Sequence, residues 1–198
     1  GAGLGRAAMC VVSEELSRGY IGVGSLGTRS EIAAELILGG GTDAQKKHWL
    51  PKIASGEILP TAVFTEPNTG SDLGSLRTRA VREGDVWKVT GNKTWITHAA
   101  RADLMTLLVR TTPLDQVERK SEGMSIFLVD LHAAIGKGLE VRPIANMVNH
   151  ETNELFFDNL EIPAANLIGE EGKGFKYILD GLNAERVLIA AECIGDGC

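Results

Sequence analysis

Hydroxyl-bearing residues gather around a proline in the stretch Phe64-Thr65-Glu66-Pro67-Asn68-Thr69-Gly70-Ser71-Asp72. An apolar run precedes this stretch, so we expect a strand that leads into a turn whose shape Pro67 fixes. Such a turn offers backbone N–H groups next to the hydroxyls of Thr65, Thr69 and Ser71. That set of donors suits a phosphate or the polar edge of a flavin. A plain capped turn has the same composition, and the residues alone leave both interpretations open.

A second candidate site lies in Leu182-Asn183-Ala184-Glu185-Arg186. Around it, apolar residues recur with the spacing of a helix that begins near Gly174, at Phe175, Ile178, Leu179, Leu182, Ile189, Ala190 and Cys193. Helical geometry places Arg186 at the centre of this apolar face, with Asn183 and Glu185 on opposite flanks. Because a buried guanidinium requires an anionic or hydrogen-bonding partner, Arg186 indicates either a bound anion or an ion pair within the chain.

The glycines of Gly22-Val23-Gly24-Ser25-Leu26-Gly27 match the GxGxxG pattern of dinucleotide-binding sites, and Asp43 follows further along the chain. That pattern requires a buried strand directly before the first glycine, because the turn must deliver a pyrophosphate to the N-terminus of a helix. Residues 16–20 have the pattern of a helix end instead. We therefore expect a glycine-rich connection between helices.

Helical spacing of apolar residues predicts three helices in the first 60 residues. The third is expected to begin at Thr42 and Asp43, which are favourable capping residues, and to end near Gly56. Pro51 is expected to kink this helix or to begin a new turn.

After Pro60 the period changes to short apolar or β-branched runs, which predict strands at 59–65, 78–82, 86–90, 93–97, 104–110, 124–130, 139–144 and 154–160. Gly84-Asp85 and Gly91-Asn92 are predicted as hairpin turns. Strands with no helical pattern between them favour an antiparallel barrel or sandwich. The predicted fold class is multi-domain α and β, with a helical N-terminal segment at 1–60, an antiparallel β-barrel or β-sandwich middle domain at 61–170, and the first helix of a C-terminal helical domain at 171–198.

The composition argues against several classes of function. Of the 198 residues, 20 are Lys or Arg and 26 are Asp or Glu, and no basic cluster of the kind that binds nucleic acid is present. No apolar run approaches the roughly 20 residues of a membrane span. The three cysteines and the four histidines lack the spacing of a disulfide framework or a metal site, so we expect a reducing compartment and no metal. The chain starts without a methionine and ends within a helical pattern, and we therefore expect it to be part of a longer protein.

Three segments give the sequence a specific resemblance. The stretch 64–72 resembles the flavin-binding signature of the acyl-CoA dehydrogenases, and Val89-Thr90-Gly91-Asn92-Lys93-Thr94-Trp95-Ile96-Thr97 resembles that family's second signature. Residues 161–169, followed by Gly172-Lys173-Gly174-Phe175, resemble its passage from the β domain to the C-terminal helices. The similarity covers essentially the whole chain. Residues 10–111 are more similar to the methylsuccinyl-CoA dehydrogenase branch and residues 121–198 to fatty-acyl branches, which leaves the acyl substrate and even a chimeric origin open.

The resemblance implies FAD as the cofactor. Phe64 and Thr65 are expected to line the isoalloxazine ring, with Thr65 bonded to its edge. Gly70 and Ser71 are expected to meet the phosphate and ribityl region, and Ser71 also the CoA thioester. The cofactor-binding residues implied in this way are Phe64, Thr65, Gly70, Ser71, Trp95, Ile96 and Thr97.

In the second signature, the resemblance implies that Trp95 flanks the flavin and that Thr97 reaches its reactive side. Asn183 and Arg186 are expected to hold the CoA moiety. Glu185 stands where some branches carry the catalytic base, whereas other branches carry it in a later helix. The structural alternatives are a core tryptophan for Trp95, a strand-end threonine for Thr97 and a helix-surface carboxylate for Glu185.

The activity implied by the family is a flavin-dependent α,β-dehydrogenation of an acyl-CoA thioester, of the kind used in fatty-acid β-oxidation. A carboxylate removes the α-proton and FAD accepts the β-hydride. Further implications are an electron-transferring flavoprotein as partner, a homo-oligomer, and a location in a bacterial cytoplasm or a mitochondrial matrix. The alternatives are an acyl-CoA oxidase and an inert fragment that binds CoA or a partner.

Overall fold

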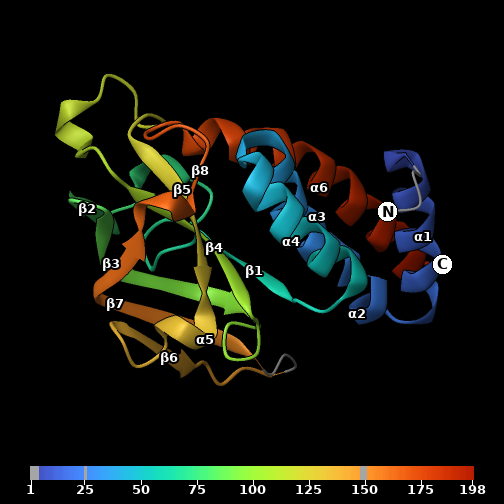
Figure 1. The fold of residues 1–198 in the computed structure, drawn as a ribbon. Helices are drawn as coiled ribbons and strands as arrows, with labels where there is room; N and C mark the ends of the chain where they lie inside the picture. Colours follow the sequence, from blue (N-terminus) through green and yellow to red (C-terminus); the bar gives the residue numbers. More distant parts are fainter. Residues whose placement is uncertain (1–4, 25, 148–150) are drawn as a thin grey trace.

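The computed structural model describes residues 5–24, 26–147 and 151–198, in which a layer of helices packs against a β-sheet (Figure 1). Its longer helices are α1 (Arg6–Gly19), α3 (Leu26–Gly40), α4 (Asp43–Ser55) and α6 (Gly174–Asp196), and its shorter ones are α2 (Ile21–Gly24) and α5 (Leu131–Ala134). The opening of the chain therefore has one short helix more than the three predicted. Among the described residues, no helix has the length and apolarity that crossing a membrane requires.

The glycine motif lies at a connection between helices, as predicted. Gly22 and Gly24 belong to α2, which follows α1 directly, and residue 25 of the motif lies outside the described residues. Within the described part, no strand precedes Gly22, so the structural requirement of a dinucleotide-binding turn is not met.

Helix α4 begins at a capping box. The Thr42 hydroxyl accepts a hydrogen bond from the backbone N–H of Gln45 at 3.2 Å, and the Gln45 side chain accepts one from the N–H of Thr42 at 2.9 Å. The same Gln45 donates to the carbonyls of Ala165 and Leu167, which ties the helix to the β part. The helix continues through Pro51 to Ser55, so the prediction that Pro51 begins a new turn is wrong.

The strands described are β1 (Pro60–Val63), β2 (Arg79–Glu83), β3 (Val86–Thr97), β4 (Leu104–Arg110), β5 (Met124–Asp130), β6 (Leu139–Pro143), β7 (Thr152–Pro163) and β8 (Leu167–Ile168). They form a sheet in the order β6-β7-β3-β2-β4-β5-β8, with β1 added beside β4. The β1–β4 pair is parallel, so the expectation of a purely antiparallel sheet is wrong there. A parallel pair needs a long crossover, and the chain between β1 and β4 supplies one through the 64–78 loop and the β2–β3 hairpin.

Two glycines predicted at hairpin turns have different roles. Gly84 has a φ of 62° and lies at the β2–β3 turn, which confirms that prediction. Gly91 lies inside β3, so the predicted turn at Gly91-Asn92 is wrong. A Cβ at Gly91 would lie 2.7 Å from the Cα of Thr78, and its φ is 147°. The glycine therefore permits a close approach of two chain segments rather than a turn.

Strand β4 is buried along its whole length because it lies between two apolar cores. Met105, Leu107 and Val109 point into a core enclosed by the sheet, together with residues of β3, β5 and β7. Leu104 and Leu108 belong to a second core, which they share with α3, α4 and α6. The second core fixes the position of the helices on the sheet.

Helix α6 packs against α1 and α3 with only part of the predicted face, since Ile178 is buried and Phe175 and Leu182 are partly buried in the second core. Leu179 and Ile189 of that face are 40% and 43% exposed. The buried residues are Gly174, Ile178, Gly181, Leu188, Ala191, Glu192 and Gly195. A Cβ at Gly195 would lie 2.1 Å from the carbonyl oxygen of Glu14 on α1. Because α6 has apolar residues on several sides, this close approach of small residues, rather than the apolar spacing, decides which side is buried.

Candidate functional site

The structure brings the two signature segments together at the end of β1. After Val63 the chain makes a tight turn, in which the N–H of Glu66 donates to the carbonyl of Thr69 at 2.9 Å and the reverse bond measures 3.0 Å. Just before the turn, the carbonyl of Thr65 accepts a hydrogen bond of 3.0 Å from the N–H of Thr94 in β3. Thr65 therefore lies beside the strand that carries the second signature.

Trp95 is held at the surface in strained backbone. Its side chain is 62% exposed, its φ is 58°, and the register of β3 against β7 shifts between Lys93 and Ile96. A bulky residue with positive φ is a genuine outlier, and a bulge of this kind re-aims a side chain. Such strain costs on the order of 1–3 kcal/mol and is common at ligand sites.

The side chains of Ile96 and Thr97, which follow Trp95, are less exposed than its ring. The Ile96 side chain is 2% exposed and belongs to the core enclosed by the sheet, so only its backbone is available to a ligand. Thr97 is half-buried at the end of β3, and its carbonyl accepts a hydrogen bond of 2.6 Å from the hydroxyl of Thr61 in β1. The second signature thus presents one exposed ring and one partly exposed hydroxyl residue.

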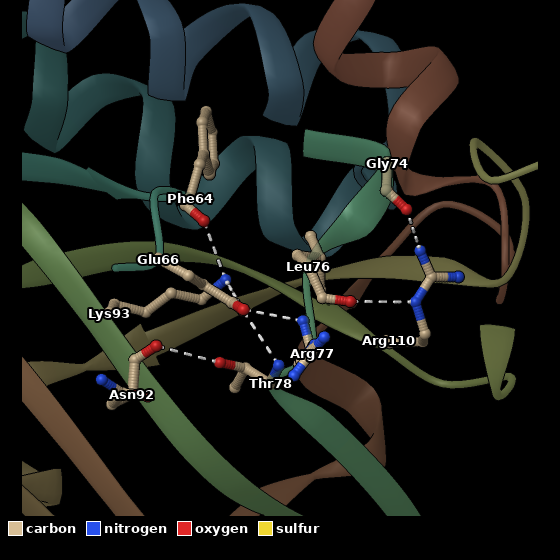
Figure 2. A network of polar contacts seen from close by, with 9 residues as sticks. All are labelled: Phe64, Glu66, Gly74, Leu76, Arg77, Thr78, Asn92, Lys93 and Arg110. Atoms are coloured by element: carbon tan, nitrogen blue, oxygen red, sulfur yellow. Dashed lines mark hydrogen bonds and ion pairs between the residues drawn. The ribbon is translucent and has the colours of Figure 1, made fainter. Parts of the chain in front are cut away.

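The remaining residues of the first signature divide between the helices and the surface. Phe64 is half-buried and turns its ring toward the helices, where it lines a small gap with Leu36 of α3 and Leu182 of α6 (Figure 2). Gly70 and Ser71 are exposed, and a Cβ at Gly70 would have no heavy atom within 4 Å. The backbone around Gly70 is therefore open to a ligand.

A buried ion pair supports this surface, and the sequence analysis missed it. The Lys93 ammonium lies 2.9 Å from Oε1 of Glu66 and donates to the carbonyl oxygen of Phe64 at 2.8 Å (Figure 2). The Glu66 carboxylate also accepts the N–H groups of Arg77, at 2.7 Å, and Thr78, at 2.9 Å. The sequence signal was limited to a glutamate inside the first signature and a lysine inside the second, because regular alternation with Ile96 would turn Lys93 outward and the register of β3 shifts between Lys93 and Ile96.

The environment changes the acidity of both groups. Burial lowers the pKa of Lys93 to about 8, against the opposing attraction of Glu66. Burial acts to raise the pKa of Glu66, but the charge of Lys93 and the N–H donors outweigh it and hold the pKa below its usual value.

Arg110, at the end of β4, forms hydrogen bonds with the part of the 64–78 loop that lies away from Lys93. Its guanidinium donates to the carbonyls of Leu76 at 3.2 Å and Gly74 at 2.7 Å (Figure 2). It also reaches the carbonyls of Lys120 and Glu122, at 3.1 and 2.9 Å. The 64–78 loop is thus held at its base by Lys93 and at its far part by Arg110.

On α6, the structure brings Asn183 and Arg186 together but leaves both exposed. The Arg186 guanidinium donates to Oδ1 of Asn183 at 2.8 Å. The prediction that Arg186 lies at the centre of a buried face is therefore wrong, because the packed side of α6 is a different one. Asn183 also lines a pocket of about 210 Å³ with residues of α1 and α3, among them Arg6 and Glu31.

Glu185 is half-buried on the same helix. Burial raises its pKa, the neighbouring charge of Arg186 opposes that shift, and the carboxylate of Glu192 adds to it. Glu192 itself is 5% exposed and accepts a hydrogen bond from the hydroxyl of Thr28. Leu182, which lines the gap beside Phe64, precedes Glu185 by three residues, so these positions occupy adjacent turns of one side of α6.

The described residues fit a flavin at the surface formed by the two signatures. Trp95 offers an exposed apolar ring on a strained backbone, and Thr65 and Thr97 lie on the adjoining backbone. The open backbone at Gly70 and Ser71 suits the phosphate end of the cofactor. Among the described residues, no cluster of three or more His, Cys, Asp or Glu side chains is placed to hold a metal ion.

Comparison with known proteins identifies the family. The model "Acyl-CoA dehydrogenase, middle domain" matches residues 61–160, and "Acyl-CoA dehydrogenase, N-terminal domain" matches residues 1–57. The (2S)-methylsuccinyl-CoA dehydrogenase of Cereibacter sphaeroides is 58% identical over 98% of this chain and 37% of its own length. The chain thus spans less than half of that relative.

Solved structures of acyl-CoA dehydrogenases superpose on this chain. The glutaryl-coenzyme A dehydrogenase glutaryl-CoA complex superposes with a TM-score of 0.88 at 30% identity, covering 98% of this chain and 49% of that one. A glutaryl-CoA dehydrogenase from Mycobacterium smegmatis in complex with FADH2 gives a TM-score of 0.85 at 29% identity over 98% and 48% of the two chains. The chain belongs to the acyl-CoA dehydrogenase family, whose members are FAD-dependent oxidoreductases.

Proposed function

We propose that the protein is a FAD-dependent acyl-CoA dehydrogenase that introduces a double bond between Cα and Cβ of an acyl-CoA thioester. The observation that carries this proposal is the hydrogen bond between Thr65 and Thr94, which places the first signature beside the exposed, strained Trp95. Family membership supports the same reaction class.

In this proposal, Thr65, Trp95 and Thr97 hold the flavin ring, the backbone of Ile96 lies between the last two, and Phe64 supports the ring from the helix side. Gly70 and Ser71 bind the phosphate and ribityl region. FAD, when bound, supplies the acceptor for the β-hydride.

Glu185 is proposed as the base that removes the α-proton. Its partial burial favours the protonated form and so brings its pKa closer to that of a base useful near neutral pH. Ser71 is proposed to contact the thioester of the substrate, and Asn183 and Arg186 to hold its CoA moiety. The exposed guanidinium of Arg186 and the amide of Asn183 supply donors for the anionic and polar groups of CoA.

We also propose a short, branched dicarboxylic acyl-CoA, such as (2S)-methylsuccinyl-CoA, as substrate. The support is the 58% identity to the methylsuccinyl-CoA dehydrogenase of Cereibacter sphaeroides. We further propose an electron-transferring flavoprotein as the electron acceptor, which family membership supports. A homo-oligomeric state, a bacterial cytoplasmic or mitochondrial location, and the division at 1–60, 61–170 and 171–198 stay predictions.

The test is anaerobic mixing of the FAD-loaded intact protein with (2S)-methylsuccinyl-CoA, butyryl-CoA and isovaleryl-CoA. The proposal predicts bleaching of the oxidised flavin absorbance, fastest with the first thioester, and reoxidation that is faster with electron-transferring flavoprotein than with oxygen. Bleaching by none of the thioesters would contradict the proposed reaction, and fast reoxidation by oxygen would favour an oxidase.

A further inference from the structure

The buried Lys93–Glu66 pair connects several parts of the candidate site. Lys93 is 0% exposed and Glu66 is 7% exposed. Together they bond the carbonyl of Phe64 and the N–H groups of Arg77 and Thr78 (Figure 2). One buried pair thus joins β3 to both ends of the 64–78 loop.

The positions of these bonds relate the pair to the cofactor contacts. Phe64 and Glu66, which Lys93 holds, are the two chain neighbours of Thr65. Lys93 itself precedes Trp95 by two residues on β3. The pair therefore sets the distance and register between the two proposed flavin contacts, Thr65 and Trp95, without lying at the surface where a ligand would bind.

Stability alone does not account for a pair of this kind. Two charges removed from water lose their hydration, and replacing a buried ion pair by neutral groups of similar size is often neutral or stabilising. Removing one partner leaves the other charge buried and uncompensated, which is strongly unfavourable. What the pair provides here, and neutral side chains would not, is a fixed orientation of the turn through charge-assisted hydrogen bonds.

We propose that Lys93 and Glu66 are positioning residues for the cofactor site: they hold the turn at 64–69 against β3 so that Thr65 and Trp95 are arranged for FAD before it binds. This inference rests on the proposed function. It assigns neither residue a contact with the cofactor or the substrate.

The experiment compares the intact protein with the double variant Glu66→Gln/Lys93→Met, which removes both charges and leaves neither unpaired. Flavin is removed, and three quantities are measured: the denaturant midpoint, amide hydrogen exchange of residues 64–78, and the Kd for added FAD. The control is Glu83→Gln/Lys88→Met, because Lys88 is on the same strand and pairs with Glu83 at the surface at 2.7 Å.

We expect the double variant to keep a denaturant midpoint near that of the wild type, to exchange amides of the 64–78 loop faster, and to bind FAD about tenfold or more weakly. A factor of ten is the scale of one charge-assisted hydrogen bond. The control should match the wild type in loop exchange and in Kd. A second variant, Lys93→Arg, keeps the charge and should retain more affinity than the double variant.

A purely structural pair would give the opposite pattern, with FAD affinity following the denaturant midpoint and returning to the wild-type value whenever stability does. Wild-type affinity in the double variant, or unchanged exchange of the loop, would overturn the inference. If the double variant fails to fold, Lys93→Arg becomes the test variant. The inference would be overturned by a Lys93→Arg protein that has wild-type stability and wild-type loop exchange but a Kd for FAD raised as much as in Trp95→Ala. Failure of the proposed function looks different, because the wild type itself would then bind no FAD, and the inference would fall with it.

Discussion

Lys93 and Glu66 form an ion pair of 2.9 Å inside the β part of the molecule, 27 residues apart in sequence. The pair joins the first flavin signature to the second from behind, while Trp95 is presented on the surface. The interior contact and the exposed ring belong to one local arrangement of β1, its following turn and β3.

The buried lysine predicts an unusual pH dependence of stability. Because the pKa of Lys93 is about 8 in the folded protein and 10.5 ordinarily, the unfolded chain holds more protons between these values. The contribution of this residue to the free energy of unfolding should therefore rise with pH across that range and be lost as pH falls through about 8.

Denaturant unfolding at several pH values from 7 to 11 checks this, read as the difference between wild type and Glu66→Gln/Lys93→Met. The surface variant Glu83→Gln/Lys88→Met is the control, because the pKa of Lys88 is raised by its hydrogen bond to Glu83. A wild-type-minus-variant difference that stays flat or falls with pH would contradict the assignment.

Gly91→Ala should destabilise the protein by about 2–4 kcal/mol, because the added methyl group meets Thr78 and the backbone has a φ of 147°. Gly19→Ala in α1 is the matched control, since a Cβ there meets nothing within 4 Å, and it should stay within about 1 kcal/mol of wild type. Urea unfolding followed by circular dichroism measures both. Equal stability of the two variants would show that Gly91 does not permit the close approach described.

Glu185→Gln should leave thioester binding nearly unchanged and slow substrate-dependent bleaching of the flavin by roughly 10² to 10⁴. In the wild type, the rate should rise with pH through a pKa above the ordinary value of 4.5, because burial raises the pKa and only the ionised carboxylate removes a proton. Stopped-flow absorbance measures both effects. The control is Asp180→Asn, an exposed acid on the same helix. A Glu185→Gln variant as fast as wild type would place the base elsewhere.

The sequence predicts the structure correctly where the structure is local. The α4 cap at Thr42 and the β2–β3 turn at Gly84 follow from residues within a few positions of one another. Prediction fails where a distant segment decides the outcome. The role of Gly91 could not be predicted because its partner, Thr78, lies at the end of the 64–78 loop, and the parallel β1–β4 pair depends on a crossover of about forty residues.

The residues of the candidate site also fall into those that can be predicted from nearby sequence and those that depend on distant segments. The two signatures located Thr65 and Trp95, and the structure places their segments side by side. The burial of Lys93 could not be predicted, because a lysine in a strand is ordinarily exposed and its partner is remote in sequence. Arg186 was placed on the wrong side of α6, because a helix that is apolar on several sides does not reveal from its own sequence which side its neighbours cover.

Titration of the flavin-free intact protein with FAD measures whether the surface around Trp95 binds the cofactor. Trp95→Ala should raise the Kd by roughly 10- to 100-fold, the scale of losing one buried aromatic contact, and Thr97→Ala should weaken binding in the same direction. Met147→Ala, a change at a side chain that is 99% exposed on the β6–β7 connection, should bind as the wild type does. Wild-type affinity in both the Trp95 and the Thr97 variants would show that FAD does not bind at this surface.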